Sequence, residues 1–218
     1  MKLKDFDAII FDMDGVLIDS EPLWKIAMEN VFKSVGCPLT RNDFKKTVGL
    51  RIDEVIQYWY QHAGWDHKTP LEVEQEIIQQ MIGLIQEKGA PLPGVIETLN
   101  YLKENEFKIG LGTSSYTILI ESVLQKLGVS EMFDFTHSAE HEDFGKPHPA
   151  VYLTVAKQLK VEPRKCLVIE DSLNGIIAGK AAQMKVICIP EKTHDKEPKL
   201  MLADAEFEDM QIMLKTIK

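Results

Sequence analysis

Two aspartates, separated by one residue, follow a short apolar run near the amino terminus. The run, Ala8 to Phe11, is continuous, which is typical of a central parallel strand with both faces covered. Asp12 and Asp14 come next, and Gly15 then breaks the strand. Open α/β sheets place their chemistry at the carboxyl ends of strands, and carboxylates at i and i+2 lie on one side of an extended backbone. This stretch therefore predicts an α/β fold and two carboxylates that can share a divalent cation.

Two other interpretations of this stretch need to be weighed. An Asp-x-Asp-Gly sequence is common in turns, because Asp bonds to its own backbone and Gly tolerates positive φ. A calcium loop of the EF-hand type fails, since its next ligand positions hold Val16 and Leu23. A functional site is favoured over a plain turn by three further polar stretches downstream, each near a predicted strand end.

Composition argues against two classes of partner. With 218 residues, 44% of them hydrophobic, the chain is long enough for a core domain and a smaller second one. Its formal net charge of −9 argues against nucleic acid and anionic membranes as partners. A small phosphorylated metabolite is still compatible with this charge, because one bound Mg²⁺ and a nearby lysine reverse the local field.

The cysteines and the amino terminus indicate the compartment. The three cysteines, Cys37, Cys166 and Cys188, are widely spaced among apolar neighbours, which is typical of small core residues in a reducing compartment. The amino terminus has neither the pattern of a signal peptide nor that of a membrane span. We therefore expect a cytoplasmic protein, and we expect it to be a monomer.

The pattern turns helical between residues 19 and 90. Apolar residues recur at helical spacing from Leu23 to Phe32 and again from Ile52 to Tyr60. Thr69-Pro70-Leu71-Glu72 has the form of a capped helix start and opens a longer helix that reaches Ile85. The Gly- and Pro-rich stretch 89–94 then returns to the sheet. We expect a helical cap domain over 19–90, inserted into a core of residues 1–18 and 91–218.

Helices and strands alternate after residue 94, as in a doubly wound sheet. Strands are predicted at 108–112, 133–136, 166–169 and 185–189, and helices at 95–104, 119–127 and 150–159. The predicted fold class is α/β, a three-layer Rossmann-like core with a doubly wound parallel sheet and a small all-helical cap domain inserted after the first strand.

Three later stretches carry candidate chemistry. Thr113 and Ser114 follow a strand and precede a helix, where hydroxyls and backbone N–H groups suit a phosphate, although an ordinary helix cap also explains them. Lys146 lies in a rigid turn bounded by prolines, which a helix start alone also explains. Glu170 and Asp171 follow an apolar strand, where carboxylates need a counter-charge or a metal, or cap a helix.

Together these stretches resemble the motifs of a known superfamily. In order and type, six residues match the four motifs of the haloacid dehalogenase-like superfamily: Asp12, Asp14, Thr113, Lys146, Glu170 and Asp171. The resemblance covers essentially the whole chain, and the helical insert looks like the small cap of the β-phosphoglucomutase-like branch. Within that branch the sequence is most similar to bacterial 2-deoxyglucose-6-phosphate and hexitol phosphatases, and the fold implied has strand order 3-2-1-4-5.

The resemblance implies a Mg²⁺-dependent phosphatase for small phosphorylated sugars or polyols. Asp12 would be the nucleophile that forms an aspartyl-phosphate, and Asp14 the general acid and base, so that both contact substrate. Thr113, the Ser114 backbone and Lys146 would hold the non-bridging oxygens of the phosphoryl group.

The resemblance also implies a metal site and two contacts from the cap. Mg²⁺ would be bound by an Asp12 oxygen, the Asp14 backbone carbonyl and Asp171, with Glu170 behind these ligands. In the cap, we expect Trp24 to cover the substrate and Arg51, which follows Gly49, to contact substrate oxygens. The other cap aromatics suit a hydrophobic core better than a ligand platform: Tyr58, Trp59 and Tyr60.

Two departures within the superfamily bear on the alternatives. Asp14 argues against halide chemistry, because dehalogenases proper lack this acid. Trp24 stands where the sugar phosphomutases have a cap histidine, and an indole cannot exchange a proton at neutral pH, which favours hydrolysis. A phosphomutase of the β-phosphoglucomutase type is the alternative, followed by a non-catalytic protein that binds a phosphorylated metabolite.

Overall fold

A parallel sheet forms the centre of the computed structural model, which describes residues 1–37, 39–47, 50–190 and 201–218. The sheet has six strands in the order β3-β2-β1-β4-β5-β6. The strands are β1 (Ala8–Phe11), β2 (Lys108–Thr113), β3 (Phe135–Ser138), β4 (Cys166–Glu170), β5 (Lys185–Cys188) and β6 (Ala205–Glu206). The predicted sheet and the order of its first five strands are confirmed, and β6 adds an edge strand that we did not predict.

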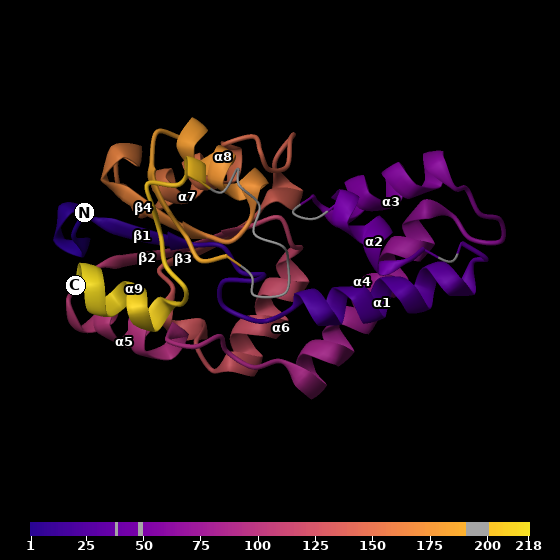
Figure 1. The fold of residues 1–218 in the computed structure, drawn as a ribbon, viewed down its shortest axis with the longest axis horizontal. Coiled ribbons are helices and arrows are strands. Elements are labelled where there is room, and N and C mark those ends of the chain that lie inside the picture. The colour runs from indigo at the N-terminus through magenta and orange to yellow at the C-terminus, as the bar shows by residue number, and fades with distance from the viewer. Residues whose placement is uncertain (38, 48–49, 191–200) are drawn as a thin grey trace.

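Helices cover both faces of the sheet (Figure 1). On one face lie α7 (Ala150–Leu159) and α8 (Leu173–Ala181), and on the other α5 (Val95–Glu104), α6 (Thr117–Leu127) and α9 (Met210–Ile217). The close approach of α7 depends on Gly110 in β2, since a Cβ there would lie 2.5 Å from Val155 Cγ1. The result is the three-layer arrangement that the alternating pattern predicts.

The segment between β1 and α5 forms a lobe of helices beside the sheet (Figure 1). It contains α1 (Glu21–Ser34), α2 (Arg41–Phe44), α3 (Ile52–His62) and α4 (Pro70–Lys88). The predicted start of α4 is confirmed, because Thr69 Oγ1 accepts from the Glu72 N–H at 3.2 Å and the Glu72 carboxylate accepts from the Thr69 N–H. Gly49, which precedes Arg51 in the predicted substrate contact, lies outside the described residues.

The two chain crossings between sheet and lobe lie side by side. Ile18 pairs with Pro91 in an antiparallel bridge, and the Leu92 N–H donates to the Leu17 carbonyl at 3.0 Å. The crossings coincide with the predicted boundaries of the insert, while its standing as a separate domain stays a prediction. None of the helices within the described ranges combines the length and the apolar character that a bilayer span requires.

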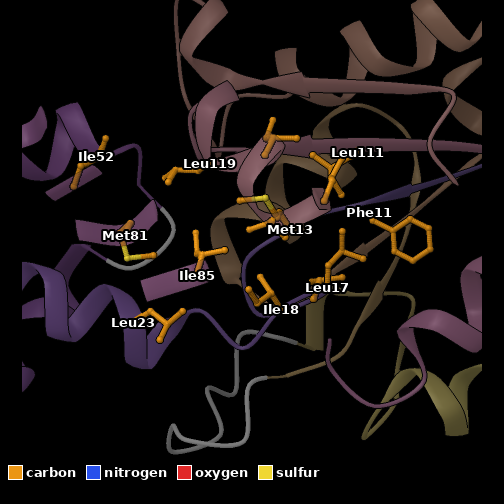
Figure 2. Packing of buried hydrophobic residues seen from close by; sticks show 14 of the residues in the cluster. Phe11, Met13, Leu17, Ile18, Leu23, Ile52, Met81, Ile85, Leu111 and Leu119 are labelled. Carbon is orange, nitrogen blue, oxygen red and sulfur yellow. The ribbon is translucent and has the colours of Figure 1, made fainter. Parts of the chain in front are cut away.

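One hydrophobic cluster continues from the sheet into the lobe. Figure 2 shows its side chains running from Phe11 and Leu111, past Ile18, to Leu23 and Ile85. All five side chains are buried. The lobe is therefore packed onto the core through shared apolar contacts as well as through its two crossings.

Candidate active site

A cavity of about 120 Å³ lies where the carboxyl edge of the sheet faces the helical lobe. Its core side is formed by the ends of β1, β2 and β4 and by the turn before α7, and its lobe side mainly by α1 and α3. The structure brings seven of the sequence-predicted site residues to its wall: Asp12, Asp14, Trp24, Thr113, Ser114, Lys146 and Asp171. Residues far apart in the chain thus meet in one place, as the sheet topology requires.

The Lys146 ammonium lies between two carboxylates. Its Nζ donates to Asp12 Oδ1 at 2.8 Å and to Glu170 Oε1 at 2.7 Å, and only 3% of the residue is exposed. Burial lowers the pKa of Lys146, but the two carboxylates more than offset this effect, so the pKa lies above its ordinary value. The lysine is therefore a fixed positive charge in the cavity.

Glu170 is held as the counter-charge of Lys146. Its Oε1 also accepts from the Tyr152 hydroxyl at 2.6 Å, and its Oε2 accepts from the backbone N–H groups of Asp171 and Ser172 at 3.0 and 3.1 Å. Burial raises the pKa of Glu170, while Lys146 and these donors bring it below its ordinary value. A Cβ on Gly175 would lie 1.6 Å from Glu170 Oε1, so only glycine leaves room for this carboxylate.

The surroundings of Asp12 disfavour its ionised form. Burial raises its pKa to about 7, the Lys146 ammonium opposes this shift, and the nearby Glu170 and Asp14 carboxylates add to it. The site holds more carboxylates than cations, because Lys146 is shared by Asp12 and Glu170. An added cation would favour the ionised form of Asp12.

The donor set fits a hard divalent metal ion. Oxygen atoms of Asp12, Glu170 and Asp171 lie within 4.8 Å of one another, and carboxylate oxygens are the ligands that such ions prefer. Each Glu170 oxygen already accepts at least two hydrogen bonds, which makes Asp12 and Asp171 the better ligands. Gly15, at φ +71°, passes so close that a Cβ would lie 2.0 Å from Asp171 Oδ2.

The Asp14 carboxylate is fixed by three hydrogen bonds from different parts of the chain. Ser20 Oγ and Trp24 Nε1 donate to Oδ1 at 2.5 and 3.1 Å, and Ser115 Oγ donates to Oδ2 at 2.6 Å. Trp24 belongs to the lobe and Ser115 follows β2, so the Asp14 carboxylate accepts hydrogen bonds from both sides of the cavity. The other aromatic residues of the lobe, which the sequence analysis did not assign to the substrate, do not line the cavity: Tyr58, Trp59 and Tyr60.

Thr113 is the last residue of β2, and Ser114 follows it at the cavity. The Thr113 hydroxyl accepts from the Ser115 N–H at 3.1 Å, which bends the chain at the strand end. Ser138, at the end of β3, donates its hydroxyl to the Ser115 carbonyl at 2.7 Å and anchors the same turn. The turn that carries the predicted phosphate contacts is therefore tied to the sheet.

The structure does not bring Arg51 to the cavity wall. Its Nη1 donates to the backbone carbonyls of Ala139 and Glu142 at 3.0 and 2.9 Å, outside the residues that line the cavity. We predicted that this side chain contacts substrate oxygens, and nothing in the sequence indicates that its partners are main-chain carbonyls.

Three side chains that donate to Asp14 or Glu170 were not identified from the sequence. Ser20 and Ser115 lie close in sequence to predicted site residues, but nothing in the sequence indicates that both donate to Asp14. Tyr152 lies on the buried face of α7, where it is indistinguishable from a core aromatic until its hydroxyl is seen on Glu170. Its ring also lies under Lys146, with Nζ 4.7 Å from the ring centroid.

Comparison with protein-family models decides the family. The model described as haloacid dehalogenase-like hydrolase matches residues 9–189, which run from β1 to just past β5. The chain belongs to this family. The resemblance inferred from the motifs is confirmed, and Asp12, Asp14 and Lys146 fall inside the matched range.

Named members of the haloacid dehalogenase-like family are similar along most of the chain. Hexitol phosphatase B of Escherichia coli strain K12 is 41% identical over 204 residues, which cover 93% of this chain and 92% of that protein. The phosphorylated carbohydrates phosphatase of Thermotoga maritima is 32% identical over 182 residues and 83% of each chain.

Solved structures of this family share the fold. A β-phosphoglucomutase from Clostridium difficile superimposes with a TM-score of 0.83 at 27% identity, covering 97% of this chain and 95% of that one. CbbY from Rhodobacter sphaeroides, crystallised with phosphate, gives a TM-score of 0.85 at 23% identity over 94% and 95% of the two chains, and shows the fold alone.

Proposed function

We propose that the protein is a Mg²⁺-dependent phosphatase that hydrolyses monophosphates of small sugars or polyols, of the hexose, hexitol or 2-deoxyglucose 6-phosphate type. The observation that carries the proposal is the hydrogen bond from the Lys146 ammonium to the Asp12 carboxylate, in the cavity that Asp14 also lines. The names of the hexitol and carbohydrate phosphatases support this substrate class.

The reaction begins at the Asp12 carboxylate. Asp12 attacks phosphorus in line, the bond from phosphorus to the sugar oxygen breaks, and Asp14 gives its proton to the leaving alkoxide. Asp14 then takes a proton from the water that attacks the aspartyl-phosphate, which restores Asp12 and releases inorganic phosphate. The three hydrogen bonds on Asp14 hold its carboxyl group in the cavity for both transfers.

Charge on the phosphoryl oxygens is offset by groups already in place. Lys146 supplies a fixed ammonium, and the hydroxyls and backbone of Thr113 and Ser114 supply donors at the end of β2. Mg²⁺, held by Asp12, the Asp14 carbonyl and Asp171, would neutralise further negative charge on the transferring group.

The contact from Trp24 to Asp14 supports hydrolysis over mutase chemistry. The indole Nε1 donates to the carboxylate at 3.1 Å but cannot accept or release a proton at neutral pH. A phosphomutase would return the phosphoryl group to a sugar and release no inorganic phosphate. A non-catalytic binding protein would transfer no phosphoryl group at all.

A phosphate-release screen tests the proposal. The protein, with Mg²⁺, is incubated with a panel of sugar and polyol monophosphates, and inorganic phosphate is measured, with Asp12→Asn as the inactive control. Release from at least one compound by the wild type alone is expected. Interconversion of sugar phosphates without release would instead show a mutase, and no turnover of any compound would contradict the enzyme.

We also propose that the protein is a cytoplasmic monomer. Residues 19–90 form a cap domain, which closes over the core of residues 1–18 and 91–218 and excludes water from the site. The buried positions of Cys37, Cys166 and Cys188 support a reducing compartment. Gel filtration of the purified protein tests the monomer, since a mass near 24.8 kDa is expected.

A further inference from the structure

The side chain of Arg51 crosses from the helical lobe to the core. It precedes the first residue of α3, and its Nη1 donates to the carbonyls of Ala139 and Glu142 at 3.0 and 2.9 Å. These carbonyls belong to the turn after β3, which leads towards Lys146. Only 14% of the Arg51 side chain is exposed, so the contact is largely shielded from water.

Residues of the lobe hold the guanidinium in this orientation. Nη2 lies 3.1 Å from Asp53 Oδ2, and Nε lies 3.7 Å from Glu54 Oε1. The second Glu54 oxygen accepts from the Arg51 backbone N–H at 3.0 Å, which ties the side chain pair to the start of α3. The planar guanidinium is thus oriented by two acids on one side and by two main-chain carbonyls on the other.

The stem of Arg51 touches the chain directly beside Lys146. A Cβ built on Gly145 would lie 3.0 Å from Arg51 Cγ and 3.2 Å from Cδ, so the stem rests on the Gly145 backbone. Arg51 therefore contacts both the first and the last residue of segment 139–145. On its core side, the same segment is anchored by Thr154 of α7, whose hydroxyl donates to Glu142 Oε1 at 2.6 Å.

From this geometry we propose that Arg51 is a positioning residue: it clamps segment 139–145 between lobe and core, and so sets the place of the Lys146 ammonium when the lobe is closed. The inference rests on the proposed function for the role of Lys146. It assigns Arg51 a task other than the substrate contact that the sequence predicts.

A second contact between lobe and core provides a matched control. Tyr116, which precedes α6, donates its hydroxyl to Glu74 Oε1 of α4 at 2.9 Å. Tyr116→Phe removes one bond between lobe and core without touching segment 139–145. Comparison with this variant separates closure of the lobe from placement of Lys146.

The test compares Arg51→Gln and Tyr116→Phe with the wild type in the full chain. We measure kcat and KM for phosphate release, and hydrogen exchange of the backbone amides in 139–146. Arg51→Gln should lower kcat by about tenfold, which is about 1.4 kcal/mol of barrier, and speed exchange in this segment. Tyr116→Phe should leave both within about twofold, because the hydroxyl that it removes contacts Glu74 and not segment 139–145.

Two results would overturn the proposal. One is unchanged exchange in 139–146 for Arg51→Gln. The other is an equal loss of kcat in both variants, which would mean that Arg51 only links the lobe to the core. Should Arg51→Gln fail to fold, Gly145→Ala presses on the same stem from the core side and must speed exchange in the segment. Hydrogen exchange needs no substrate, so a wild type that releases no phosphate refutes the proposed function while the clamp is still tested.

Discussion

Replacement of Asp12, the proposed nucleophile, should make the metal-free protein more stable. Burial raises the pKa of Asp12 from 3.8 to about 7, so the folded protein holds this carboxylate ionised at a cost. At about 1.4 kcal/mol for each pKa unit, this cost is at most about 4 kcal/mol above neutral pH. Asn has nearly the same shape and no charge, and Asp12→Asn should therefore raise the free energy of unfolding by up to that amount.

The gain should depend on pH in a defined direction. The folded carboxyl binds its proton more tightly than the unfolded one, so the contribution of Asp12 to stability is complete below pH 3.8 and is lost as pH rises through about 7. The variant and the wild type should thus be nearly equal near pH 4, diverge between pH 4 and 7, and keep a constant difference above that.

Urea unfolding of both proteins in EDTA at several pH values measures this difference. Added Mg²⁺ should narrow it, because a bound cation favours the ionised form of Asp12. The reasoning is refuted if Asp12→Asn is no more stable than the wild type at pH 8, or if the gain is the same at pH 4. In a separate assay with Mg²⁺ and without urea, Asp12→Asn should abolish phosphate release. Activity within about tenfold of the wild type, about 1.4 kcal/mol, would exclude Asp12 as the nucleophile.

Three further predictions concern the support of Glu170, the metal and Trp24. Tyr152→Phe removes a hydroxyl that donates to the buried Glu170 at 2.6 Å. Since a hydrogen bond to a charged group contributes about 1.5–3 kcal/mol, the urea midpoint should fall without a change in m, and an unchanged midpoint would contradict the role of the hydroxyl. Chelation by EDTA should stop phosphate release and added Mg²⁺ should restore it, whereas an unaltered rate in excess EDTA would rule out the metal. Trp24→Ala should change relative rates over a sugar phosphate panel more than it changes Mg²⁺ affinity measured by calorimetry, and identical relative rates would assign Trp24 to packing alone.

The fold was predictable where apolar runs are continuous and clearly bounded. The helices predicted at 95–104 and 150–159 match α5 and α7, and the buried strand at 166–169 lies within β4. The final part of the chain was missed for physical reasons. β6 has only two residues, too few for a period to show, and α9 follows it with eight residues whose buried face is Met210, Met213 and Ile217.

The charged part of the site was predictable because its residues are rare at strand ends unless a partner stabilises them. Asp12 and Asp171 stand out in sequence for this reason, and Lys146 stands out because prolines bound its turn. The structure brings all three to one cavity. The hydroxyl donors could not be found this way. Ser115 donates to Asp14 across 101 residues of sequence, and a serine after a strand has many other uses. The contacts of Arg51 with the core could not be predicted, because its partners are main-chain carbonyls, which every residue carries.

The pairing of Ile18 with Pro91 has a consequence for how proteins of this design can diversify. An insertion whose ends lie side by side can be lengthened, trimmed or exchanged for another unit without moving the strand before it or the helix after it. Selection for a new substrate can then act on the exchangeable unit, while the phosphate chemistry stays encoded elsewhere. A chimera that keeps 1–18 and 91–218 and carries the lobe of a relative would be the engineering counterpart of that process.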